Sequence, residues 1–124
     1  MKYLLDTNIC ILLLGGNVPL LRRRVEQCDE GNLGMSAIVF AELAVGSWQG
    51  KLPPLQTVDA FSRWVPVLPF DEASARLYAQ LPFKRGSFDR LIAAHALSLG
   101  LTLITNNKRD FADVPGLRIE NWTL

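Results

Sequence analysis

The chain has 124 residues, of which 49% are hydrophobic and 20% are charged, and its formal net charge is +1. This length predicts one domain, residues 1–124, with a core that needs no disulfide or metal to hold it. The composition excludes a disordered chain. Because the net charge is close to zero, the chain can attract nucleic acid only through a local charged patch and not through its overall electrostatic field.

The cysteines and the apolar runs predict a cytoplasmic protein. Cys10 and Cys28 lack the spacing of a C-x-x-C motif and lie in helix-like segments, so we expect both to be reduced. The apolar run at residues 9–14 is too short for a secretory signal, and no stretch approaches the length of a membrane span. We therefore expect no contact with a membrane.

Short apolar runs alternate with longer helical patterns along the whole chain. The expected strands are residues 2–6, 33–35, 65–69, 101–105 and 117–120. The expected helices are residues 7–14, 18–28, 36–49, 53–64, 71–81 and 87–99. This alternation, with continuous apolar strands, predicts an α/β domain of three layers, α/β/α, around a mostly parallel and buried sheet.

Asp6 interrupts an apolar stretch at the end of the first strand. Apolar residues flank it at 3–5 and 9–14, so we expect its carboxylate to be partly buried, which is costly without a partner. Asp is also a favoured N-cap, and capping of the helix that begins at Thr7 explains the residue equally well. The rest of the chain shifts the balance between capping and a buried acidic site, because it places further acids next to apolar segments.

Two further acids lie on predicted helices. Glu42 has no basic residue three or four positions away, so an ion pair along the helix does not explain it; the alternative is a carboxylate at the edge of the apolar face that reaches water. Asp89 falls in the first turn of the most apolar helix, where the helix dipole favours an acid in any case. That helix is rich in alanine and should pack closely, which would bring Asp89 near the sheet.

Thr105 and Asp110 follow the fourth predicted strand. Such residues commonly form turns. In a parallel α/β sheet, however, the carboxyl ends of the strands line the ligand crevice, and both Asp6 and Thr105 are expected there. If Glu42, Asp89 and Asp110 join them, the carboxylates repel one another at neutral pH and need a compensating cation.

The donor types favour Mg²⁺, with Mn²⁺ as a second choice, because both are hard cations that prefer oxygen ligands. Zinc is disfavoured, since the cysteines are not arranged as ligands and His95, the single histidine, is expected on a helix surface. Such a site is suited to metal-assisted hydrolysis of a phosphodiester, in which the metal polarises the phosphoryl oxygen and lowers the pKa of an attacking water.

Five blocks of the sequence carry a family resemblance. They are residues 3–8, residues 36–38 with 41–43, residues 89–96, residues 105–107 with 110–111, and residues 114–122. In this order and spacing they resemble the PIN-domain proteins, most closely the VapC-type toxins of bacterial toxin–antitoxin pairs. The resemblance covers nearly the whole chain and implies a PIN-like α/β/α fold.

The resemblance also implies a function and its partners. The family implies a magnesium- or manganese-dependent endoribonuclease that acts on RNA and forms homodimers. It implies a cognate VapB-type antitoxin that covers the active site and binds the operator DNA on behalf of the pair.

Site residues follow from the resemblance by position. Asp6, Glu42 and Asp89 would be the metal-site acids, and Asp110 would be the fourth. Thr105 would hydrogen-bond within the site and orient an acid or water. The neighbouring Asn8 and Asn106 would support the acidic loops.

One segment departs from the family pattern. Related toxins usually have a longer connection before the third acid, whereas residues 81–88 are short and basic here. Lys84 and Arg85 could meet RNA phosphates, or they could belong to a solvated loop. The departure concerns the shape of the substrate entrance and leaves the acid itself in place.

Three rival functions fit the sequence less well. A haloacid-dehalogenase-type phosphatase needs a second Asp two residues after the first, and Asn8 occupies that position. A phosphoacceptor receiver domain needs a mid-chain Asp at the end of a strand, whereas Asp59 lies in an amphipathic helix pattern. A catalytically silent PIN scaffold would be recognised by the loss of an acid, and all four acids are present.

Overall fold

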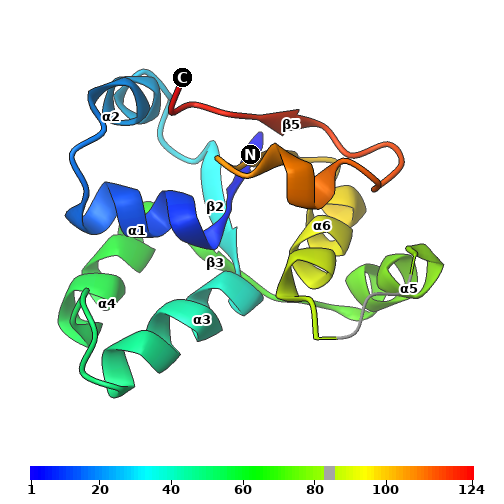
Figure 1. The fold of residues 1–124 in the computed structure, drawn as a ribbon, viewed down its shortest axis with the longest axis horizontal. Helices are drawn as coiled ribbons and strands as arrows, with labels where there is room; N and C mark the ends of the chain where they lie inside the picture. Colours follow the sequence, from blue (N-terminus) through cyan, green and yellow to red (C-terminus); the bar gives the residue numbers. More distant parts are fainter. Residues whose placement is uncertain (83–85) are drawn as a thin grey trace.

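The computed structural model describes residues 1–82 and 86–124, and a parallel sheet runs through its centre (Figure 1). The strand order is β3-β2-β1-β4-β5, and each neighbouring pair is parallel. The strands are β1 (Tyr3–Leu5), β2 (Leu33–Ser36), β3 (Val67–Leu68), β4 (Thr102–Ile104) and β5 (Ile119–Glu120). The chain thus adds strands to one side of β1 and then to the other.

Helices cover both faces of this sheet. They are α1 (Thr7–Gly15), α2 (Pro19–Glu26), α3 (Ala37–Trp48), α4 (Leu55–Trp64), α5 (Glu72–Gln80) and α6 (Phe88–Leu99), with a 3₁₀ helix η1 (Lys108–Phe111). Figure 1 shows α1 and α4 on one side of the strands and α5 and α6 on the other, while α3 contacts helices from both sides. The predicted three-layer α/β/α architecture is confirmed.

The core explains why the strands read as continuous apolar runs. Leu4 and Leu5 of β1 and Leu103 and Ile104 of β4 are all fully buried, because successive side chains point to opposite faces and each face is covered by helices. The middle of α6, residues 92–96, is buried as well. The acid that follows Leu5 therefore emerges from the most protected strand pair of the domain.

Local signals fix where the helices begin and end. Ser36, Asp71 and Ser87 cap α3, α5 and α6 through side-chain oxygens that accept backbone N–H groups, as the sequence predicts. Gly100 ends α6 in the left-handed conformation, at φ 66°, which a residue with a Cβ adopts at a cost.

The structure differs from the sequence predictions in detail. The segment after β4 was expected to be a loop and contains η1. The second helix ends at Glu26 rather than Cys28.

Both cysteines are free, as expected. In the described ranges, no helix is both long enough and apolar enough to cross a membrane.

Candidate active site

Asp6 joins the ends of two neighbouring strands. Its backbone N–H donates to the Ile104 carbonyl at 3.0 Å, which holds the end of β1 beside the end of β4. Its Oδ1 accepts the Thr7 N–H and its Oδ2 accepts the Thr105 hydroxyl, both at 2.8 Å. With 5% of its surface exposed, Asp6 is both the cap of α1 and a buried carboxylate, so both interpretations of this residue hold.

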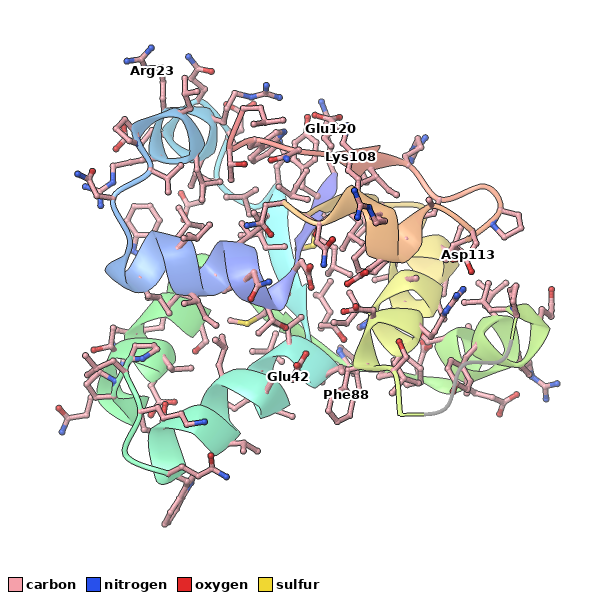
Figure 2. All side chains as sticks on the ribbon, viewed as in Figure 1. Arg23, Glu42, Phe88, Lys108, Asp113 and Glu120 are labelled. Carbon is pink, nitrogen blue, oxygen red and sulfur yellow. The ribbon has the colours of Figure 1, made fainter. Side chains whose placement is uncertain are left out.

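Glu42 reaches the same place from α3. Its Oε1 accepts the Thr7 hydroxyl at 2.8 Å. Figure 2 shows Glu42 on the part of α3 that faces the start of α1. The carboxylate is therefore half-buried and held by Thr7, and part of it still reaches water at the edge of the apolar face.

Asp89 and Asp110 meet between α6 and η1. The two carboxyl groups lie within hydrogen-bonding range of each other, a contact that needs one of them to carry a proton. The Asn107 amide donates to Asp110 Oδ2 at 2.5 Å, and the Asn107 backbone N–H donates to the Thr105 hydroxyl oxygen at 3.0 Å. A continuous chain of hydrogen bonds thus runs from Asp6 through Thr105 and Asn107 to Asp110.

The four acids interact electrostatically. Burial raises the pKa of Asp6 and that of Glu42, against the lowering effect of their hydrogen bonds. Burial, followed by the charges of Asp6, Asp110 and Glu42, raises the pKa of Asp89 to about 6. No ion pair within residues 1–82 and 86–124 joins any of the four to a lysine or arginine.

The donor chemistry fits a hard divalent cation, although the side chains are not arranged around one point. Four carboxylates within mutual electrostatic range supply only oxygen donors, as Mg²⁺ and Mn²⁺ prefer. Among the described side chains, no three of His, Cys, Asp or Glu already form a group that could hold a metal. Binding would therefore require the carboxylates to turn toward a shared ion.

The sequence prediction for His95 was wrong. His95 is almost completely buried, because the face of α6 that carries it packs into the domain. Its Nδ1 lies 2.8 Å from Ser36 Oγ, the cap of α3, and its ring packs edge-on against Phe70. The histidine thus joins the helices that carry Glu42 and Asp89, and the described residues place it in no metal group.

Two residues of the site were missed in the sequence. Thr7 holds Glu42, and its position directly after Asp6 was the available signal. Asn107 holds Asp110, whereas Asn106, which the resemblance placed in that supporting position, is exposed and makes no side-chain hydrogen bond to the described acids. Lys84 and Arg85 lie outside the described residues.

Comparison with known proteins identifies the family. The sequence profile of the PIN-domain family matches residues 3–117. The chain belongs to the PIN-domain family. Its relatives are VapC ribonucleases: it is 34% identical to the "tRNA(fMet)-specific endonuclease VapC" of Shigella flexneri, over 99% of both chains, and 32% identical to "Ribonuclease VapC2" of Haemophilus influenzae, over 98% of both.

Solved structures agree with this family assignment. VapBC2 from Rickettsia felis, bound to a DNA fragment from its promoter, has a TM-score of 0.85 at 30% identity, over 98% of this chain and 99% of that one. VapBC-1 from nontypeable Haemophilus influenzae has a TM-score of 0.84 at 32% identity, with both chains fully covered. This PIN domain therefore has the fold of the VapC toxins over its whole length.

Proposed function

We propose that this PIN domain is a metal-dependent endoribonuclease and the toxin of a VapBC-type toxin–antitoxin pair. The observation that carries the proposal is the gathering of Asp6, Glu42, Asp89 and Asp110 at the carboxyl ends of β1 and β4, with no basic partner among the described residues. The names of the relatives, a tRNA-specific endonuclease and several ribonucleases, support RNA as the substrate.

In this proposal the acids hold Mg²⁺ or Mn²⁺. Asp6 and Asp89 would be direct ligands, and Glu42 and Asp110 would complete the site directly or through water. The ion, when bound, supplies charge to a phosphoryl oxygen and lowers the pKa of an attacking water.

The chain's own residues set the orientation of these acids. Thr105 and Thr7 each occupy one lone pair on an Asp6 oxygen, which leaves the second lone pair of each oxygen available. Thr7 holds Glu42 by Oε1 and leaves Oε2 available. The two threonines therefore fix the carboxylates without consuming their capacity to bind a cation.

The partners follow from the same assignment. Several solved neighbours are VapBC complexes, one bound to a DNA fragment from its promoter and another bound to DNA, which supports a cognate VapB-type antitoxin that binds operator DNA. An antitoxin arginine that enters among the four carboxylates would inhibit by substituting for the charge of the metal. A homodimer in the cytoplasm completes the proposal, and analytical ultracentrifugation tests the dimer.

The deciding experiment is cleavage of a mixed RNA pool by the purified chain with Mg²⁺, with Mn²⁺ and with EDTA. The variant is Asp6→Asn, and the control is Asp59→Asn, an exposed position on α4. We expect metal-dependent cleavage that Asp6→Asn abolishes and Asp59→Asn retains. Cleavage at the wild-type rate by Asp6→Asn contradicts the site.

A catalytically silent PIN scaffold is the second candidate, and one observation favours it. The described acids do not already form a three-ligand metal group. The same experiment separates the two functions, because a folded chain that cleaves no RNA with any metal supports the scaffold.

A further inference from the structure

Two adjacent residues at the start of α6 contact two residues in and just after η1. The carboxyl group of Asp89 lies within hydrogen-bonding range of that of Asp110. The next residue, Arg90, forms an ion pair with Asp113, with Nη2 2.5 Å from Oδ2. Both contacts cross the same junction between α6 and the η1 segment.

The first contact alone cannot hold this junction together. Asp89 and Asp110 both carry carboxyl groups, so the two side chains repel each other when both are ionised. Asn107 holds Asp110 from within its own segment, so an attractive interaction across the junction is what would hold the η1 segment against α6. The Arg90–Asp113 pair, one and three positions away along the two segments, supplies it.

Burying the charged side chain of Arg90 to provide that attraction costs free energy. Only 5% of its surface is exposed, and within the described residues its Nε and Nη1 have no hydrogen-bond partner. A buried ion pair adds little net stability over an apolar pair of the same size. An ion pair is directional, whereas apolar burial is not. Phe111 and Val114 already anchor the segment by apolar burial, but this does not fix the rotation of η1, which the ion pair can do.

The ion pair of Arg90 is with Asp113, and within the described residues no ion pair joins Arg90 to any of the four acids. Arg90 therefore does not neutralise the site, and any effect on catalysis must pass through the position of the η1 segment.

We propose that Arg90 and Asp113 are a positioning pair that holds Asp110 against Asp89 and thereby sets the geometry of the acidic site. The inference rests on the proposed ribonuclease function for its kinetic test. It adds two residues to the site, neither of which contacts the substrate or the metal.

The kinetic test uses Asp113→Asn, Arg90→Met and the double variant. We expect each single change to lower kcat about tenfold, with KM changed less than about twofold, because a misplaced acid weakens the chemical step. The double variant should be no slower than the slower single one, since the changes remove one interaction. Asp113→Glu should recover part of kcat by restoring the ion pair.

The control variants lie away from the junction. Glu72→Gln and Arg76→Met break an exposed pair on α5 and should leave kcat unchanged. Val58→Ala removes buried volume in α4 and lowers stability far from the junction. If the loss of kcat in Asp113→Asn only follows the unfolded fraction, as it would in Val58→Ala, the positioning pair is contradicted.

A second readout does not depend on activity. Amide hydrogen exchange of residues 108–114 should quicken at least about tenfold in Asp113→Asn and Arg90→Met, and stay unchanged in Arg76→Met. If the wild-type protein cleaves no RNA, the proposed ribonuclease function is overturned. Hydrogen exchange then tests the positioning pair on its own. Unchanged exchange, or an unchanged kcat in an active enzyme, would overturn the pair.

Discussion

Thr105 shows how one hydroxyl can organise several carboxylates. It donates to Asp6 and accepts from the Asn107 N–H, so it uses both of its hydrogen-bonding functions inside a fully buried position. Asn107 in turn holds Asp110. The side chain itself does not ionise, yet the relative orientation of two acids depends on it.

Replacing Thr105 by valine should therefore reduce the cleavage activity while leaving the packing around the residue nearly unchanged. The substitution keeps the volume but leaves the Asn107 N–H and Asp6 Oδ2 without their partner. We expect the cleavage rate to fall about ten- to hundredfold, and the free energy of unfolding to fall by about 1–3 kcal/mol. Thr102→Val, in the strand that precedes Thr105, is the matched control, because Thr102 takes no part in the hydrogen bonds from Asp6 through Thr105 to Asn107. Equal rates in the two variants would contradict the prediction.

Asp89 should make the metal-free protein sensitive to pH. Burial and neighbouring carboxylates raise its pKa from 3.8 to about 6, so the folded state binds the proton more tightly than the unfolded state. The resulting stabilisation is complete below pH 4 and is lost as the pH rises through about 6.

The variant Asp89→Asn measures this effect, because asparagine cannot ionise. In EDTA at pH 7.5 its melting temperature should exceed that of the wild type, and the difference should disappear near pH 4. Thermal melts across this range check it, with Asp59→Asn on the exposed face of α4 as the control. A wild-type melting temperature that does not change between pH 5 and 7.5 would show that the ionisation of Asp89 does not destabilise the fold.

At the scale of elements, the sequence predicts the helices and strands well because their signals are local. Caps at Ser36, Asp71 and Ser87 and a stop at Gly100 depend on neighbours in the chain. The 3₁₀ helix η1 and the burial of His95 depend instead on packing between segments far apart in sequence. A histidine on an apolar helix can face solvent or the core, and periodicity alone does not decide which.

The contact between Ser36 and His95 leads to a prediction at this scale. Ser36 Oγ caps α3 by accepting the Ile38 N–H and also meets His95 Nδ1. Ser36→Ala removes both interactions in a fully buried place, so we expect a loss of about 2–4 kcal/mol in the free energy of unfolding. Ser87→Ala removes only the cap of α6 and should cost about 1 kcal/mol. Urea denaturation compares them, and equal losses would show that the histidine contact contributes nothing.

At the scale of the whole molecule, the order of the strands creates the site. The chain reverses its direction of sheet growth at β1, and in parallel α/β sheets ligands bind where this reversal occurs. The sequence predicts that Asp6 and Thr105 share this edge, since both follow strands. It does not predict the Thr7–Glu42 contact or the Arg90–Asp113 pair, because their partners lie 35 and 23 residues apart and meet only in the folded chain.

The same arrangement predicts how the folded domain responds to metal. Four carboxylates that destabilise one another in EDTA gain a shared partner when a divalent ion binds, and an ion that binds only the folded state stabilises it by mass action. At a Mn²⁺ concentration about a hundredfold above the dissociation constant, the gain is about 2.7 kcal/mol. We expect a higher melting temperature in Mn²⁺ than in EDTA at pH 7.5.

The variants make this expectation specific to the site. Asp6→Asn and Asp89→Asn should each lose most of the shift, because each removes a proposed ligand. Glu72→Gln, which removes an exposed carboxylate on α5, should keep it. At pH 5 the wild type should also lose part of the shift, since Asp89 is then largely protonated and a proton competes with the ion. A shift of equal size in Asp6→Asn and in the wild type would place the ion elsewhere on the molecule and remove the metal from the proposed mechanism.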